Sequence, residues 1–439
     1  IHKLPAGHCL RLSDKDGLRI SRYWSPYNKC NAANKFEMSE KEIFDELINL
    51  LRRSIKDRMM SDVPFGAFLS GGIDSSLNVA LMAELMNRPV DTYTIGFKEL
   101  EKYNELKYAR QISDLYKTNH HEIVIDDKDG FDILEKLPFY EDEPNLDPTC
   151  IPLYFLSKLT RESGTIVVQV GEGSDEQFCG YNWMLRDWKF QNNQFKIFSG
   201  MPSVVKKMIH AAASPILNGM NLELASDYIR RGVHNEKFFW SGQSFYSPTH
   251  LSKLFNPKFA ELSGNPYKHV QKMYAESAAL NPHADDLQEY LFLELSQRLS
   301  EMLLMRVDKI GMAHSIEARV PFLDHRIVEF TMSIPQNMKM PDMKTTKYLL
   351  KKAVEPILPH DIIYRRKQGF TAPMNEWLAK QWHSYTKDNI LNSELSKLGI
   401  FNMDYMKSIL LKHKEGKTNA GTMIYSMLNL HLWYKQFWG

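Results

Sequence analysis

Short apolar segments alternate with helical ones between residues 63 and 170, and this alternation restricts the fold more than any other feature of the chain. The expected strands span residues 63–69, 90–97, 121–125 and 165–170. The expected helices span residues 75–86, 104–116, 131–137 and 151–162. Strands separated by helices of this length build a parallel sheet, so we predict an α/β fold with a doubly wound parallel sheet.

The segments on either side of this region have a different character. Residues 4–24 predict two extended segments around a polar turn, a hairpin too small to fold alone. Residues 26–35 are polar and rich in asparagine, and we place a domain boundary there. Residues 40–60 have the apolar spacing of an amphipathic helix. From residue 183 onward helical patterns dominate, and almost no strand is expected.

Composition excludes several classes of partner. The 439 residues carry 55 basic and 53 acidic side chains, a net charge of +2 that gives no long-range attraction for nucleic acid or an anionic membrane. No apolar run approaches the roughly 20 residues of a membrane-spanning helix. The four cysteines form no C-x-x-C pair, which favours a reduced, cytoplasmic setting over a disulfide framework or a zinc site.

A glycine- and serine-rich segment, Ser70-Gly71-Gly72-Ile73-Asp74-Ser75-Ser76, follows the first expected strand and opens the next helix. Glycines let the backbone approach phosphates, and the N–H groups at a helix N-terminus favour anions. The serines add hydroxyl donors, and Asp74 can hold a magnesium ion beside a polyphosphate. In the alternative interpretation, Asp74 or Ser75 merely caps the helix. The setting favours a phosphate-binding loop.

A second loop of glycines and acids, Gly171-Glu172-Gly173-Ser174-Asp175-Glu176, follows the fourth expected strand. Ligands of open parallel sheets bind beyond the carboxyl ends of strands, near the point where the strand order reverses. Asp74 and Asp175 both lie just past such ends, so we expect them to converge on the magnesium ion of an ATP complex. The alternative is that Ser174 or Asp175 only caps the following helix.

Further motifs follow in order along the chain. They include the segment from Asp308-Lys309-Ile310-Gly311 to Pro321-Phe322-Leu323-Asp324, and Arg365-Arg366-Lys367-Gln368-Gly369-Phe370 followed by Pro373. With the two loops, they resemble the synthetase portion of the asparagine synthetase family of glutamine-dependent amidotransferases, from about Glu37 to the C-terminal third. The resemblance implies a HUP-like sheet of the PP-loop ATP pyrophosphatase type with a helical C-terminal region. It also implies a synthetase domain at 36–439, preceded at 1–35 by the remnant of a glutaminase domain plus linker.

The resemblance assigns a role to each matching position. The implied ATP-binding residues are Phe68, Ser70, Gly71, Gly72, Asp74, Ser75, Ser76, Ile95, Val170 and Gly171, and the implied Mg²⁺ ligands are Asp74 and Asp175. Glu172 matches the acid that assists amide formation, because a carboxylate near the acyl carbon can orient ammonia and take its proton. Lys367 matches the lysine that neutralises the reacting phosphate; without the resemblance, its basic run reads as a solvated surface. For Glu317, Arg319 and Asp324 we expect an ion-pair network that shapes the site.

The implied activity is that of an ATP-dependent, AMP-forming amide ligase, which adenylates a carboxylate and aminates it with ammonia. Members of this type obtain ammonia from a glutaminase domain with an N-terminal cysteine, which this chain does not show, so we expect it to use free ammonia but not glutamine. The side chain of aspartate is the leading acceptor, and the oligomeric state, with a homodimer among the options, stays open.

Two alternatives for the substrate remain. Residues 142–152 differ from the T-I-R-A-S segment of many dedicated asparagine synthetases, which keeps a uronic acid of a surface polysaccharide or a small peptide as alternative acceptors. The β-lactam synthetases are similar in fold but have a tyrosine at the position of Glu172, which favours an external amine here. The second alternative is an RNA-modifying PP-loop enzyme, which needs a basic patch that the sequence does not reveal.

Overall fold

Five parallel strands form the central sheet in the computed structural model, which describes residues 2–30, 36–98, 100–220, 222–237, 248–259, 265–369 and 372–439. The strands are β3 (Phe65–Phe68), β4 (Asp91–Phe97), β5 (Asn119–Ile125), β6 (Val167–Gln169) and β7 (Glu317–Arg319). The four strands expected from the sequence are confirmed. The fifth, β7, is the one named strand beyond residue 183 among the described residues, where almost no strand was expected. It has only three residues, two of them charged, so its strand geometry comes from pairing with β6.

The order of the strands is β5-β4-β3-β6-β7, and every neighbouring pair is parallel. The chain runs outward from β3 to β4 and β5, and then crosses back to place β6 on the other side of β3. The strand order therefore reverses between β3 and β6, where a crevice for ligands is expected. The glycine- and serine-rich loop follows β3 and the second acidic loop follows β6, so the predicted switch point holds both.

The helices of this α/β half largely follow the sequence pattern. They are α1 (Glu40–Asp57), α2 (Ile73–Leu85), η1 (Glu101–Tyr103), α3 (Leu106–Tyr116), α4 (Asp127–Ile133), α5 (Leu137–Glu141), α6 (Cys150–Glu162) and α7 (Ser174–Phe178). The expected helix at 131–137 is wrong, since α4 ends at Ile133 and α5 begins at Leu137. Asp126 caps α4 in a capping box, and Pro138 suits the first turn of a new helix.

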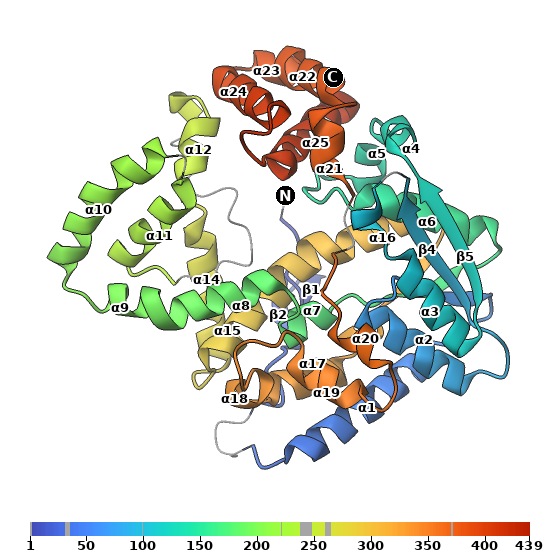
Figure 1. Cartoon of the computed structure of the whole chain (residues 1–439). Helices are drawn as coiled ribbons and strands as arrows, with labels where there is room; N and C mark the ends of the chain where they lie inside the picture. The colour runs from blue at the N-terminus through green and yellow to red at the C-terminus, as the bar shows by residue number, and fades with distance from the viewer. Residues whose placement is uncertain are drawn as a thin grey trace.

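Most of the remaining chain is helical (Figure 1). Residues 182–312 form α8 (Asn182–Phe190), the π-helical η2 (Gln191–Phe195), α9 (Lys196–Ser199), α10 (Ser203–Gly219), α11 (Glu223–Val233), α12 (Pro248–Leu254), α14 (Tyr267–Leu280), α15 (Asp286–Leu293), the π-helical η4 (Glu294–Leu304) and α16 (Met305–Met312). After β7 come η5 (Pro321–Leu323), α17 (His325–Ser333), α18 (Gln336–Lys339), α19 (Tyr348–Val354), α20 (His360–Tyr364), α21 (Met374–Ala379), α22 (His383–Asn392), α23 (Glu394–Lys397), α24 (Met403–Lys414) and α25 (Gly421–Trp438). We call residues 182–439, apart from β7, the helical half.

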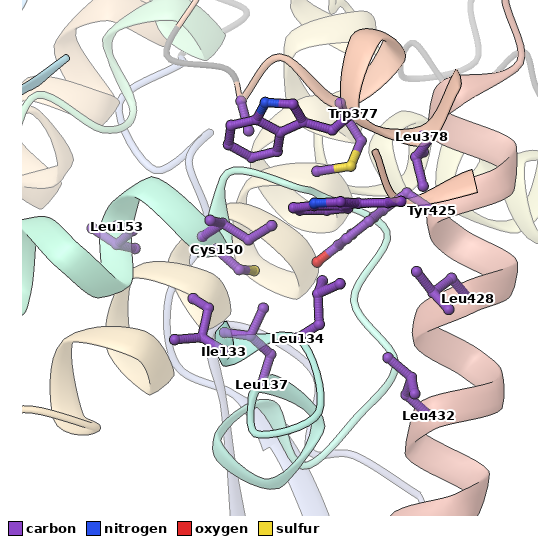
Figure 2. Close-up of a cluster of buried hydrophobic side chains, with 14 of the residues drawn as sticks. Ile133, Leu134, Leu137, Cys150, Leu153, Trp377, Leu378, Tyr425, Leu428 and Leu432 are labelled. Carbon is purple, nitrogen blue, oxygen red and sulfur yellow. The ribbon is translucent and has the colours of Figure 1, made fainter. Parts of the chain in front are cut away.

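The two halves share hydrophobic cores. One core joins Ile133, Leu137 and Leu153 of the α/β half to Trp377 and residues of α25 (Figure 2). Figure 2 shows these side chains pointing toward one another from helices that are far apart in sequence. A second core joins α1 and α2 to residues of α17 and α19. Burial of apolar side chains from both halves fixes the helical half against the sheet.

The N-terminal hairpin lies beside the helical half. Strands β1 (His8–Ser13) and β2 (Gly17–Arg22) pair antiparallel, as expected. Leu12 is 74% exposed and Leu18 60% exposed, so the hairpin has an apolar surface that the described residues do not cover. Among the helices that the structure describes, none combines the length and the apolar character needed to cross a membrane.

Candidate active site

A cavity of about 680 Å³ opens at the carboxyl ends of β3 and β6, with walls from both halves of the molecule. The predicted site residues that line it are Phe68, Ser70, Gly72, Asp74, Ser75, Ile95, Val170, Gly171, Glu172, Asp175 and Lys367. Two predicted ATP-binding residues, Gly71 and Ser76, are not among the lining residues. Ser76 is fully buried in α2. The structure therefore gathers most of the predicted positions around one space.

The loop after β3 is shaped by its own glycines and hydroxyls. Gly71 has a φ of +68°, and a Cβ atom there would lie 2.5 Å from the backbone carbon of Tyr108. The glycine is thus required by the packing behind the loop, rather than by access from the cavity. Ser75 Oγ accepts a hydrogen bond from the backbone N–H of Ser70 at 3.2 Å. Gly72 is the N-cap residue of α2, and no side chain forms a capping hydrogen bond there. Asp74 and Ser75 lie inside the helix, so the interpretation of either residue as a helix cap is wrong.

Asp74 and Asp175, which the sequence predicts to converge, both form an ion pair with Lys347. Lys347 Nζ lies 2.5 Å from Asp74 Oδ2 and 2.8 Å from Asp175 Oδ1. Ser174 Oγ donates to Asp74 Oδ1 at 2.6 Å. Gly173 precedes α7 without a side-chain cap, so Ser174 and Asp175 do not cap that helix either. The side chains of both loops are directed to a common point instead.

The charges around Asp175 determine its ionisation. Burial raises the pKa of the Asp175 carboxyl, but the ammonium groups of Lys347 and Lys367 outweigh burial and hold that pKa well below its usual range. Burial likewise lowers the pKa of Lys347, and the carboxylates of Asp175 and Asp74 more than reverse this, so its net pKa is raised. Both partners are therefore charged at neutral pH, in a site where Lys347 is only 4% exposed.

A pair of carboxylates of this kind fits a magnesium ion that is bound mainly through nucleotide phosphates. Mg²⁺ in such sites takes one or two protein carboxylates together with phosphate oxygens and water. Within the part of the chain that the structure describes, no three or more His, Cys, Asp or Glu side chains are arranged to hold a metal by themselves. Asp74 and Asp175 thus suit a metal that arrives with a nucleotide.

Glu172 faces the same cavity but is paired with an arginine. Arg306 Nη2 donates to Glu172 Oε1 at 2.7 Å, and Arg306 Nη1 donates to Thr149 Oγ1 at 2.5 Å and to Asp147. Burial raises the pKa of the Glu172 carboxyl, and the shared charge of Arg306 offsets only part of the effect. Glu172 therefore holds a proton more tightly than an exposed glutamate, as a proton acceptor in catalysis needs.

Lys367 is also held in the cavity rather than in a solvated basic run. It forms an ion pair with Asp175, and its Nζ lies 4.0 Å from the centre of the Tyr181 ring, a cation–π contact. The motif around it ends at Phe370, which lies outside the described residues.

The expected ion-pair network near residues 317–324 exists but does not line the cavity. Asp324 accepts from Arg58 Nη1 at 3.0 Å and from Arg326 Nη2 at 2.7 Å, and its side chain is 6% exposed. Glu317 and Arg319 form a separate, more exposed pair at 2.7 Å. Because Arg58 follows α1 and Arg326 belongs to α17, the Asp324 network braces these two helices.

Sequence reasoning missed Lys347 and Arg306. Lys347 stands in the polar run Lys344-Thr345-Thr346-Lys347, which looks like a surface turn, and Arg306 stands in an ordinary helical pattern. No local pattern marks either residue. Only the folded structure shows that each of them forms an ion pair with an acid of the other half of the molecule.

Comparison with known proteins shows which sequences this chain resembles. The chain matches the family model of asparagine synthase over residues 46–435. It is 29% identical to the glutamine-hydrolysing asparagine synthetase 1 of Bacillus subtilis, over 91% of this chain and 60% of that protein. It is 28% identical to a putative glutamine-hydrolysing asparagine synthetase of Mycobacterium tuberculosis, over 100% of this chain and 64% of that protein. The chain therefore spans less than two thirds of the length of these relatives.

Proposed function

The chain belongs to the asparagine synthase family, and on that premise we propose that it is the synthetase part of an ATP-dependent amide ligase that forms AMP and pyrophosphate. The observation that carries the proposal is the meeting of Asp74, Glu172, Asp175 and Lys367 around one cavity at the switch point of the sheet. Nucleotides bind at this place in doubly wound folds.

The residues that line the cavity have separate roles in the first step of the proposed reaction. The ATP phosphates lie against the loop of Ser70 and Gly72, and the adenosine lies near Phe68, Ile95 and Val170. An oxygen of the acceptor carboxylate attacks the α-phosphorus, and the bond to pyrophosphate breaks. Negative charge gathers on the departing phosphates, and the ammonium group of Lys367 stabilises it. A Mg²⁺ ion held by Asp74 and Asp175 supplies further neutralisation when bound.

The second step takes place at Glu172. Ammonia attacks the acyl carbon of the mixed anhydride, and AMP leaves with the electron pair of the broken C–O bond. The nitrogen must lose a proton, and the carboxylate of Glu172, with its raised pKa, accepts it. Arg306 keeps the carboxylate oriented through the hydrogen bond from Nη2.

For the acceptor, we propose the side-chain carboxylate of aspartate. The names of the relatives support this choice over a uronic acid or a peptide carboxylate. An RNA-modifying activity finds no support in those names. A reducing, cytoplasmic setting belongs to the same proposal, since Cys9, Cys30, Cys150 and Cys179 are all free thiols.

We also propose that residues 1–35 are the end of a glutaminase domain plus linker, because the relatives are longer and are named as glutamine-hydrolysing. The exposed apolar face of the β1–β2 hairpin suits cover by such a domain. Lys3 forms ion pairs with Glu143 and Glu301, at a smaller cavity of about 210 Å³ that shares Arg306 and Met302 with the main one. This smaller cavity is a candidate entry for ammonia. Assembly as a homodimer stays a prediction.

A pyrophosphate-release assay tests the proposal. The protein is mixed with ATP, Mg²⁺ and ammonium, and with aspartate, a uronic acid or a short acidic peptide in turn. We expect release with aspartate, together with AMP and asparagine in equal amounts. Release only with the uronic acid or the peptide overturns the acceptor and leaves the chemistry. Release with none of them, under conditions where the protein is folded, counts against the ligase. Adding glutamine in place of ammonium tests the expectation that this chain alone cannot use it.

A further inference from the structure

The cationic side chains that line the main cavity differ in whether they form an ion pair with an acidic side chain. Lys347 and Lys367 pair with Asp175, and Arg365 forms an ion pair with Glu105. Lys351 is half-buried in the same lining, and no acid among the described residues lies within ion-pair distance of it. Among the described residues, its Nζ donates a long hydrogen bond to Thr346 Oγ1, at 3.4 Å, and lies 5.7 Å from the centre of the Tyr364 ring. Arg366 also lacks an acid, but it is exposed to solvent.

The place of Lys351 in the fold brings it beside the loop after β3. Lys351 lies in α19, four residues after Lys347, which precedes this helix with a left-handed backbone (φ +54°), and both side chains line the cavity. Lys347 reaches Asp74 in the first turn of α2, the turn that directly follows the glycine- and serine-rich loop. Lys351 therefore lies near the start of α19, on the same cavity wall as Lys347.

This arrangement is unfavourable without a bound anion. Burial and the like charge of Lys347 lower the pKa of Lys351, and the carboxylates of Asp342 and Asp74 offset only part of this effect. A half-buried ammonium group beside another cation gains most when a multiply charged anion enters. Lysine is a common phosphate ligand because its compact ammonium group donates three hydrogen bonds. The loop that contains Ser70 and Gly72 lines the same cavity and is the proposed phosphate-binding site.

We propose that Lys351 binds the terminal phosphates of ATP and retains contact with the pyrophosphate that leaves. The proposal rests on the proposed ligase function and adds a residue to it. Lys367, which pairs with Asp175, stabilises the charge that gathers on the departing phosphates as the bond breaks, and Lys351 adds a contact at their terminal end. Lys351 is thereby a recognition element for pyrophosphate.

The test compares Lys351→Gln with Lys352→Gln and Lys351→Arg. Lys352 is the neighbouring lysine, is 40% exposed and pairs with Glu355 on the surface, so it is a matched control. For Lys351→Gln we expect the KM for ATP and the inhibition constant for pyrophosphate each to rise about tenfold, the size of one charge-assisted hydrogen bond. The KM for the acceptor should not change. Lys351→Arg should recover most of the loss, and Lys352→Gln should behave as wild type.

Two outcomes overturn the inference: unchanged pyrophosphate inhibition in Lys351→Gln, or a rise confined to the KM of the acceptor. Calorimetric titration of the wild type and Lys351→Gln with Mg²⁺–pyrophosphate gives a readout that does not need turnover. If the wild type shows no ligase activity but binds pyrophosphate through Lys351, the proposed function fails and the inference stands. The melting temperature without ligand should not fall in Lys351→Gln, whereas a purely structural lysine would lower it when removed.

Discussion

The two halves of the molecule contribute opposite charges to the site. The α/β half supplies the acids Asp74, Glu172 and Asp175, all on loops or first turns that follow strands. The helical half supplies the cations Arg306, Lys347 and Lys367. Each half alone would present charges of one sign in a space that excludes much of the water. The site therefore exists only where the halves dock, and its charges hold the halves in register.

Three acids of the α/β half, the buried Glu141 and the half-buried Glu172 and Asp175, show how strongly this matters. Asp175 meets two lysines, and its pKa lies far below normal. Glu172 shares one arginine with Asp147, and its pKa lies above normal. Glu141 has no cation within ion-pair distance among the described residues and accepts a hydrogen bond from Asn429 at 2.9 Å; burial raises its pKa to about 7. Asp175, with two cations, has a lowered pKa, whereas Glu172, which shares one cation, and Glu141 both have raised pKa values.

Replacing Lys347 by methionine is the most direct test of the charge pairing between the two halves. The substitution keeps the apolar stem but leaves Asp74 and Asp175 as two close carboxylates, with only Lys367 still paired to Asp175. Loss of one partner of a buried ion pair costs about 3–5 kcal/mol, so we expect the free energy of unfolding to fall by that amount in urea titrations. Millimolar Mg²⁺ should restore part of the loss, because the freed carboxylates can then hold the ion.

The matched control is Lys352→Met, since Lys352 forms only a surface pair with Glu355. Such pairs contribute about 0–1 kcal/mol. Equal losses in the two variants would show that Lys347 does not connect the halves, and a Lys347→Met protein indifferent to Mg²⁺ would argue against the metal position.

Asp175→Asn tests the acid that receives the most positive charge. Asparagine keeps the shape but neither balances Lys347 and Lys367 nor holds Mg²⁺ as a carboxylate does. We expect kcat for pyrophosphate release to fall about 100-fold or more, and the Mg²⁺ concentration for half-maximal rate to rise. Asp324→Asn is the control: it loses the acid between Arg58 and Arg326, outside the cavity, and should lower the melting temperature without changing the Mg²⁺ dependence. The reverse pattern would place the metal elsewhere.

The difference between the halves also explains what the sequence could predict. Asp74, Glu172 and Asp175 directly follow strand patterns, so local periodicity and the rule for parallel sheets place them together. Lys347 and Arg306 have no such marker, because their positions depend on how helices dock over long sequence separations. The same limit applies to β7, whose three residues form a strand only beside β6. Lys367 was predicted through the resemblance alone.

Glu141→Gln examines the acid that has no cation within ion-pair distance in the described part of the chain. Because the pKa of Glu141 is raised from 4.5 to about 7 in the folded state, its contribution to stability is complete below pH 4.5 and is lost as the pH rises through 7. This loss is roughly 3 kcal/mol at most. Urea titrations at pH 5 and pH 8 should show a smaller fall for Glu141→Gln than for the wild type. Glu143→Gln, at a half-exposed pair with Lys3, should keep the wild-type fall. A fall of wild-type size in Glu141→Gln would mean that other groups cause it.

Arg306→Lys tests the charge pairing at Glu172, the acid that shares one cation with Asp147. Lysine keeps the charge but cannot reach Glu172 on one side and Thr149 and Asp147 on the other at the same time, as the forked guanidinium does. Weaker pairing raises the pKa of Glu172 further, so less of it is ionised near neutral pH. We expect the amination rate at pH 7 to fall about tenfold, and the rise of rate with pH to move to higher pH.

The control for this variant is Arg326→Lys, which loses the same kind of fork, between Asp324 and Asp57, away from the cavity. That variant should lose some stability and keep the wild-type pH profile. If Arg306→Lys lowers the rate equally at every pH, Arg306 positions the substrate instead of setting the ionisation of Glu172. A shift of the profile to lower pH is incompatible with Glu172 as the proton acceptor, because weaker pairing with the cation at position 306 makes its carboxylate more basic.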